Sequence, residues 1–294
     1  PGAAMTTFLS VRNLSVKLRG GPRLLRSVSL DLPKGHVHGL VGESGAGKSM
    51  IGKAILGILP AAVEIVEGEI FLDGEDLLKM PEAARRKRIG ATAALIPQDP
   101  LTALNPSRRV GGQITDRLVD ILGWSRADAD ARALELLGEV QIPDAPRVLR
   151  SYPHELSGGM RQRILIASAF AAEPKLIIAD EPTTALDVTV QKQILRLIGD
   201  MQARHATAML FITHDLGVMS KVCQSLSILY AGKVVEHTEV GQFCRAPGHA
   251  YSAALLAATP IYTDPTCGLN PVPQSVIDAV LADVADADAN WGKG

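Results

Sequence analysis

The sequence is poor in cysteine, in net charge and in long hydrophobic runs. Its cysteines, Cys223, Cys244 and Cys267, are far apart, odd in number and without a C-x-x-C pair. This pattern argues against a metal site and fits reduced thiols in a cytosol. The net charge of −1 at pH 7 gives no basic field that would favour nucleic acid as a partner.

No apolar run reaches the roughly 18 to 20 residues that span a bilayer, because polar residues or proline interrupt the longest candidates. We therefore expect a chain that does not cross a membrane by itself. The start of the sequence has no charged and apolar leader, so secretion is not expected. Residues 1–4 precede Met5 and are interpreted as a cloning remnant. A basic run at 85–88 is expected to be the solvated C-terminal end of a helix.

What the sequence does contain is a complete phosphate-binding loop. Residues 42–49 read Gly-Glu-Ser-Gly-Ala-Gly-Lys-Ser, which fits G-x-x-x-x-G-K-[ST] at every fixed position. Its backbone N–H groups can surround an anion, Lys48 adds a positive charge, and the Ser49 hydroxyl can ligate Mg²⁺. An apolar strand at 37–41 precedes the loop and an apolar-faced helix at 50–58 follows it, as the motif requires. We expect a nucleoside triphosphate to be held by Gly42, Glu43, Ser44, Gly45, Ala46, Gly47, Lys48, Ser49 and Met50.

The order of the remaining patterns predicts an α/β fold. Alternating segments in 8–32 and 68–72 predict antiparallel strands that form a small β layer. Apolar runs at 89–97, 175–179 and 208–213 predict further strands, which we expect to form a mainly parallel sheet with helices on both faces. Residues 126–140 predict a helix whose Leu134, Leu137 and Val140 point inward. The expected domains are a main domain at 5–260, with an inserted helical subdomain at about 99–165, and a peripheral extension at 261–294.

Polar residues at the ends of these strands indicate the chemistry. The strand at 175–179 ends in Asp180 and Glu181, of which one can hold Mg²⁺ while the other orients an attacking water. Gln98 and His214 follow two other predicted strands, although His214 taken alone favours a structural role. Because the carboxyl ends of parallel strands share one edge, these residues are expected to gather around Lys48.

A second anion-seeking helix start follows the pattern Leu156-Ser157-Gly158-Gly159-Met160. A helix N-terminus offers free N–H groups and a positive dipole end, and Ser157 adds a hydroxyl. One nucleotide already fills the first site. We therefore expect Ser157, Gly158 and Gly159 to face a nucleotide held by another subunit in a head-to-tail dimer.

Over about residues 8–260 the sequence resembles an ABC transporter ATPase subunit. The resemblance rests on a full set of motifs: the loop at 42–49, Gln98, the pattern at 156–160, Asp180-Glu181, Ala185-Leu186-Asp187 and His214. The resemblance implies ATP and Mg²⁺ as cofactors and ATP hydrolysis as the reaction. It implies that Ser157 and Gly159 contact the γ-phosphate bound by a second such subunit. It also makes Glu181 the base for water, His214 a γ-phosphate clamp and Asp187 a communicator across the dimer. With Glu181 as the base, it implies Ser49, Gln98 and Asp180 as the Mg²⁺ ligands and Gln98 as a further catalytic residue.

A narrower likeness is to the oligopeptide, dipeptide and nickel importers. It rests on the segments at 98–106, 152–155, 181–189 and 247–251. It implies a homo- or heterodimer at the cytoplasmic face of the cell membrane, two permease subunits, a solute-binding protein and a peptide cargo, with nickel or a metal chelate as the alternative. No nucleic acid is implied. That group often carries a C-terminal cysteine cluster, but here only Cys267 lies in the region, so no iron–sulfur site is expected.

Other classes explain the sequence less well. A soluble ABC ATPase of DNA repair or chromosome organisation would carry a long coiled coil or a zinc module, and the sequence has neither. A stand-alone phosphate-loop kinase or GTPase would leave Ser157-Gly158-Gly159 unexplained. The family's adenine-stacking aromatic, about thirty residues before the lysine, is replaced by Leu18-Arg19, so base stacking is expected to come from Arg19 or to be weak.

Overall fold

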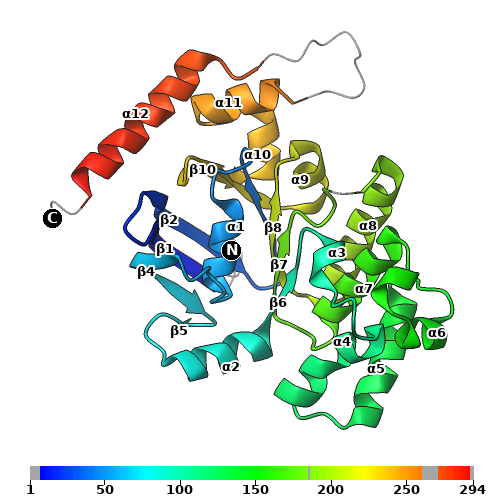
Figure 1. Cartoon of the computed structure of the whole chain (residues 1–294). Helices are drawn as coiled ribbons and strands as arrows, with labels where there is room; N and C mark the ends of the chain where they lie inside the picture. Colours follow the sequence, from blue (N-terminus) through cyan, green and yellow to red (C-terminus); the bar gives the residue numbers. More distant parts are fainter. Residues whose placement is uncertain (1–6, 185, 260–270, 292–294) are drawn as a thin grey trace, which may run out of the picture. The chain divides into compact units, whose positions relative to one another are not determined.

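The computed structural model of the chain describes residues 7–184, 186–259 and 271–291. The predicted remnant at 1–4, Ala185 and Cys267 lie outside these residues. The described chain forms two compact units (Figure 1). The first comprises 7–79, 211–259 and 271–291, and the second comprises 80–184 and 186–210.

An antiparallel sheet opens the first unit, as the alternating pattern predicted. Its strand order is β2-β1-β4-β5, and the strands are β1 (Thr7–Leu18), β2 (Arg23–Pro33), β4 (Val63–Leu72) and β5 (Glu75–Asp76). In β2 the buried residues Leu25, Val28, Leu30 and Leu32 lie among exposed or half-buried neighbours. This spacing turns one face of the pleated strand toward the core, with a shift in register near Ser27 where φ is +49°.

The phosphate loop follows a strand that pairs in parallel with its neighbour. All five residues of β3 (Val37–Val41) are buried, and β3 pairs in parallel with β9 (Ser225–Tyr230). The loop leads from β3 into α1 (Lys48–Ile55), and β10 (Lys233–Glu239) forms a hairpin with β9. His38 lies inside this layer between Ser225 and Ser227, and burial lowers its pKa to about 3. His38 is therefore a neutral core residue.

Helices complete the first unit: α9 (Leu216–Val222), α10 (Val240–Arg245), α11 (Ala250–Ala257) and α12 (Gln274–Asn290). In the C-terminal segment, α12 buries Val280 and Val284 and bonds to β2 through Asp288.

The second unit combines parallel strands with a helical segment. β6 (Ala93–Ile96) pairs in parallel with β7 (Leu176–Asp180), and β8 (Ala208–Thr213) leads the chain back toward the first unit. Between β6 and β7 the chain is largely helical, with α3 (Pro100–Ala103), α4 (Val110–Asp116), the π-helical η1 (Arg117–Ile121), α5 (Arg126–Glu139), α6 (Ala145–Arg150), the 3₁₀ turn η2 (Pro153–Glu155) and α7 (Gly158–Phe170). The remaining helices are α2 (Glu82–Thr92) and α8 (Val188–His205).

Three local predictions for this unit were wrong. The basic run at 85–88 lies within α2 rather than at its C-terminal end. The run predicted as one strand at 89–97 is divided between the buried end of α2 and β6, because short apolar runs do not distinguish helix from strand. Leu134, Leu137 and Val140 were predicted to point inward. Leu137 in α5 and Val140, which follows α5, are buried, but Leu134 is 41% exposed. The other buried residues of α5 are Ala129, Ala133 and Leu136.

Candidate nucleotide site

The phosphate loop closes around the ammonium group of Lys48. Its Nζ donates hydrogen bonds to the carbonyl oxygens of Gly42 at 2.7 Å and Glu43 at 2.8 Å. Lys48 is only 4% exposed, so its charge lies within the concave side of the loop. Gly47 has a φ of +101° and precedes the first turn of α1, which contains Ser49 and Met50. This left-handed residue, which suits glycine, turns the loop into the helix N-terminus.

The loop is fitted tightly against β9. A Cβ atom on Gly42 would overlap the backbone carbonyl oxygen of Leu229, which no side-chain rotation could relieve. We expect Gly42→Ala to lower the free energy of unfolding by about 1–3 kcal/mol, the usual cost of overpacking a dense core. Denaturant unfolding would measure this. Gly199→Ala in α8 is the control: its Cβ would meet nothing within 4 Å, so it should stabilise by about 0.5–1 kcal/mol. Equal stability of the two variants would contradict this account of Gly42.

Two tyrosine side chains lie close enough to Glu43, the second residue of the loop, to feel its charge. The rings of Tyr230 in β9 and Tyr251 in α11 are 4.6 Å apart between centroids. Burial raises the pKa of both phenols, and the nearby Glu43 carboxylate raises them further. Both tyrosines therefore stay neutral, and Tyr251 brings α11 into contact with Tyr230 of β9.

In the second unit, the structure brings Gln98 and Glu181 together. Glu181 follows the last residue of β7, and Gln98 Nε2 donates to its Oε2 at 3.4 Å. Glu181 has a φ of +44°, a conformation that is uncommon for a residue with a side chain. Such strain is found where surrounding contacts fix a functional geometry. The predicted proximity of these two strand ends is therefore observed within the unit.

Two residues that the sequence analysis did not single out support this turn. Thr184 Oγ1 donates to Glu181 Oε2 at 2.9 Å. The buried Gln162 of α7 donates from Nε2 to the carbonyl oxygen of Pro182 at 2.8 Å. The second contact links residues 20 positions apart and has no local sequence signal. Gln162 stands between Arg161 and Arg163, so nothing in the sequence marks it as a buried residue.

Ser157 and Asp187 both cap helices. Ser157 Oγ accepts from the N–H of Met160 at the start of α7, and Gly158 and Gly159 form the first positions of that helix. Asp187 Oδ1 accepts from Thr189 N and Val190 N at the start of α8. Gly159 lies near Val190, since a Cβ there would be 3.6 Å from Val190 Cγ1. These residues therefore lie at neighbouring helix starts within the second unit.

The predicted residues are divided between the two units. Residues 42–50 and His214 belong to the first unit, where His214 follows β8 and precedes the cap of α9 formed by Asp215. Gln98, Ser157, Gly158, Gly159, Asp180, Glu181 and Asp187 belong to the second. Within each unit the site residues lie at strand ends and helix starts, as a ligand site of an α/β protein requires.

The donor set fits Mg²⁺ better than a transition metal. Ser49, Gln98 and Asp180 offer a hydroxyl, an amide oxygen and a carboxylate, which are hard oxygen ligands. The bond from Gln98 Nε2 to Glu181 leaves Oε1 as the ligating atom of that amide. Among the described residues, no group of three or more His, Cys, Asp or Glu side chains could hold a metal ion. A Mg²⁺ of this kind would also be held by phosphate oxygens of the nucleotide.

A strand, phosphate loop and helix, together with a second strand that ends in two carboxylates, define a nucleoside-triphosphate-binding protein of the phosphate-loop α/β class. The family model described as "ABC transporter" matches residues 25–184. The chain belongs to this family, and the resemblance seen in its motifs and the predicted fold class are confirmed.

Curated relatives match most of the chain. "Probable D,D-dipeptide transport ATP-binding protein DdpD" of Escherichia coli (strain K12) is 47% identical, covering 87% of this chain and 79% of that protein. "Dipeptide transport ATP-binding protein DppD" of Lactococcus lactis subsp. cremoris (strain MG1363) is 42% identical, covering 97% and 83%. "Oligopeptide transport ATP-binding protein OppD" of Bacillus subtilis (strain 168) is 44% identical, covering 87% and 73%.

Solved structures share the fold. A structure titled "ATP binding subunit of ABC transporter" superposes with a TM-score of 0.66 at 30% identity, covering 81% of this chain and 92% of that one. CbiO1 from Clostridium perfringens superposes with a TM-score of 0.71 over 82% and 92% of the two chains. Its identity of 23% supports the fold alone. In the part of the chain that the structure describes, no helix has the length and apolar character needed to span a bilayer.

Proposed function

We propose that this chain is the ATP-binding and ATP-hydrolysing subunit of an ABC importer that takes up di- and oligopeptides through separate membrane permeases. The observation that carries the proposal is the phosphate loop closed around Lys48, in a chain that belongs to the ABC transporter family. Asp180, the last residue of β7, and Glu181 just after it add the carboxylates for hydrolysis. The peptide cargo rests on the relatives named as dipeptide and oligopeptide transport ATP-binding proteins.

Each of the predicted site residues has its own role in ATP hydrolysis. Gly42 to Met50 bind the triphosphate, and Lys48 balances its charge. Glu181 accepts the proton of the attacking water, in the orientation that Thr184 and Gln98 give its carboxylate. His214 contacts the γ-phosphate. Ser49, Gln98 and Asp180 would hold Mg²⁺, which would neutralise charge that develops on the phosphates.

The working unit is a dimer of this chain with itself or with a close relative. Ser157, Gly158 and Gly159 offer the N-terminus of α7 to the nucleotide of the second subunit. Asp187 caps the neighbouring helix, and Val188 beside it is 66% exposed, which suits a surface that a second subunit covers. ATP then acts as a ligand with higher affinity for the closed dimer, which allows binding to drive a conformational change.

Two permease subunits and an extracytoplasmic solute-binding protein complete the transporter. The segment at 99–106 is the proposed docking surface for the permeases, because Gln98 joins it to the catalytic carboxylate and its Leu101 is 62% exposed. In this proposal the chain lies on the cytoplasmic face of the cell membrane. Residues 5–260 form the ATPase domain, with a helical subdomain at about 99–165 and an extension at 261–294.

Uptake measurements test the cargo. In cells whose copy of this chain is deleted, uptake of labelled di- and oligopeptides should be lost, while uptake of labelled nickel should be unchanged. Wild-type protein should restore peptide uptake and Glu181→Gln should not. Loss of nickel uptake alone would replace the peptide cargo with nickel. Normal uptake of both, combined with sensitivity to DNA damage, would assign the ATPase to DNA repair instead.

A further inference from the structure

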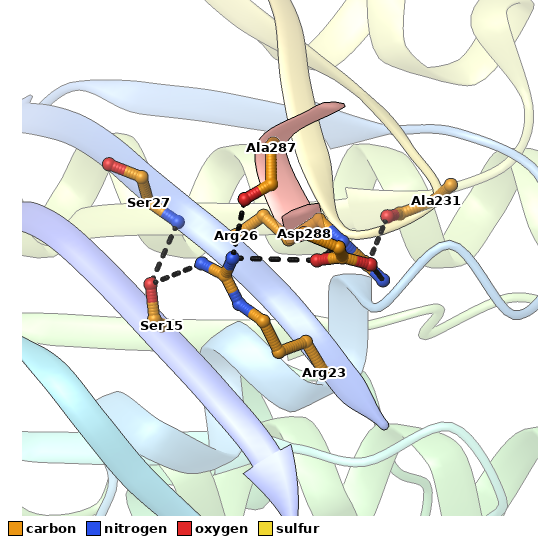
Figure 2. A network of polar contacts seen from close by, with 7 residues as sticks. All are labelled: Ser15, Arg23, Arg26, Ser27, Ala231, Ala287 and Asp288. Carbon is orange, nitrogen blue, oxygen red and sulfur yellow. Dashed lines mark hydrogen bonds and ion pairs between the residues drawn. The ribbon is translucent and has the colours of Figure 1, made fainter. Parts of the chain in front are cut away.

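The C-terminal helix α12 is fastened to β2 by one carboxylate and two guanidinium groups. Arg26 Nε and Nη2 donate to Asp288 Oδ1 and Oδ2 at 2.8 and 2.7 Å, a two-pronged ion pair (Figure 2). Arg23 Nη1 donates to the carbonyl oxygen of Ala287 at 3.3 Å and to Asp288 Oδ1 at 3.4 Å. Bidentate arginine–carboxylate pairs fix geometry as well as distance. Asp288 therefore fixes the side chains of Arg23 and Arg26, both in β2, relative to each other.

The rest of α12 keeps this carboxylate in place. Val280 and Val284 are buried at positions four residues apart, and Asp288 continues the same face of the helix. Just beyond the helix, the ring of Trp291 lies 4.7 Å from the guanidinium carbon of Arg23. Asp283, on a neighbouring face, is 3.6 Å from Lys233 of β10. The helix is thus seated along a continuous surface of the first unit.

Arg26 connects this helix to the phosphate loop. Its Nη1 donates to the carbonyl oxygen of Ala231 at 2.7 Å, and its backbone N–H donates to the carbonyl oxygen of Gly232 at 2.8 Å. The N–H of Gly232 in turn donates to the carbonyl oxygen of Ala46 at 2.9 Å. Ala46 lies inside the phosphate loop. A short series of hydrogen bonds therefore runs from Asp288 through Arg26 and the turn at 231–232 to the loop.

The two arginines that bind Asp288 are mostly buried. The side chains of Arg23 and Arg26 are only 7% and 12% exposed. The hydrogen bond from Arg26 lowers the pKa of Asp288, so the carboxylate is charged throughout the neutral range. Without that charge, two mostly buried cations on one strand would repel each other and lack their shared partner. β2 and the turn at 231–232 would then have to shift, and the phosphate loop is bonded to that turn.

We propose that Asp288 and Arg26 are positioning residues of the nucleotide site, through which α12 sets the shape of the phosphate loop and hence its affinity for ATP. This inference rests on the proposed function of the loop. It extends the site to a helix that begins more than 200 residues after Lys48 in the sequence. The C-terminal extension thereby acts in nucleotide binding.

Binding of ATP to the full chain, with Asp288→Asn as the variant, tests the inference. Asparagine keeps the shape and removes the charge, and the 38% exposed Asp288 side chain leaves room for the change. We expect the dissociation constant for ATP to rise about 5- to 20-fold, the scale of one charge-assisted hydrogen bond. KM for ATP should rise similarly, while kcat at saturating ATP stays within about twofold. Arg26→Lys, which keeps the charge but loses the fork, should weaken binding to a similar degree.

Asp283→Asn is the matched control, because it removes a carboxylate from the same helix without touching Arg26. It should bind ATP as the wild type does. The inference is overturned if Asp288→Asn and Arg26→Lys bind ATP like the control, and equally if they bind more tightly, since α12 would then restrain the site rather than shape it. Failure of the wild-type chain to bind ATP would instead refute the proposed function.

Discussion

Glu181→Gln should stop ATP turnover while leaving ATP binding intact. We expect kcat to fall about 10²- to 10⁴-fold, the usual contribution of a general base. Glutamine has the same shape and can still accept the hydrogen bond from Thr184 Oγ1, which in the wild type is 2.9 Å long. The turn should therefore be preserved, and only the capacity to take a proton is lost. With hydrolysis blocked, ATP should hold the dimer closed, because nothing then converts the ligand that favours the closed state.

Phosphate release and light scattering, each with and without ATP and Mg²⁺, would measure both effects. The control is Glu173→Gln, because Glu173 is also a glutamate of the second unit in the left-handed region, with a φ of +46°. It lies in the turn after α7 rather than at the end of β7, so turnover and dimerisation should match the wild type. Normal hydrolysis by Glu181→Gln would remove Glu181 from its assigned role. Lost hydrolysis in a variant that stays monomeric with ATP would refute the dimer.

The parts of the site that could be predicted from the sequence are those fixed by local chemistry. The phosphate loop carries its glycines, lysine and serine within eight residues, and β3 and α1 flank it as expected. Gln98 and Glu181 could be placed near each other because each follows a strand of a parallel pair, and β6 and β7 form that pair. The rule that the carboxyl ends of parallel strands share one edge of the sheet was enough for this prediction, without any information on contacts.

Features that depend on long-range packing could not be predicted. The ion pair between Arg26 and Asp288 joins residues 262 positions apart. Its helix is rich in aspartate and alanine and buries only Val280 and Val284, so the sequence gives little amphipathic signal. Leu134 is the opposite case, because the sequence pattern predicted burial and the side chain is exposed. Its spacing suits a buried helical face, but the small residues Ala129 and Ala133 occupy that face instead.

Lys48→Ala should abolish the binding of ATP. The ammonium is buried in the loop and donates to the carbonyl oxygens of Gly42 and Glu43, so in the proposed site it would lie beside the phosphates. Alanine removes the charge that offsets the triphosphate, and it leaves two carbonyl oxygens facing the same anion. Charged hydrogen bonds to phosphate are among the strongest in proteins. We expect the dissociation constant for ATP to rise by about 10²-fold or more, which corresponds to roughly 3 kcal/mol or more.

Titration calorimetry with ATP and Mg²⁺ would measure this loss, and Lys53→Ala provides the comparison. Lys53 lies in the last turn of the same helix α1, where a cation interacts with the helix dipole rather than with the loop. Its removal should leave ATP affinity within about twofold while lowering the net charge by the same amount. A general effect of charge would weaken both variants equally. Retained affinity in Lys48→Ala would contradict the assignment of residues 42–49 as the phosphate loop, and with it the proposed role of the chain as an ATPase.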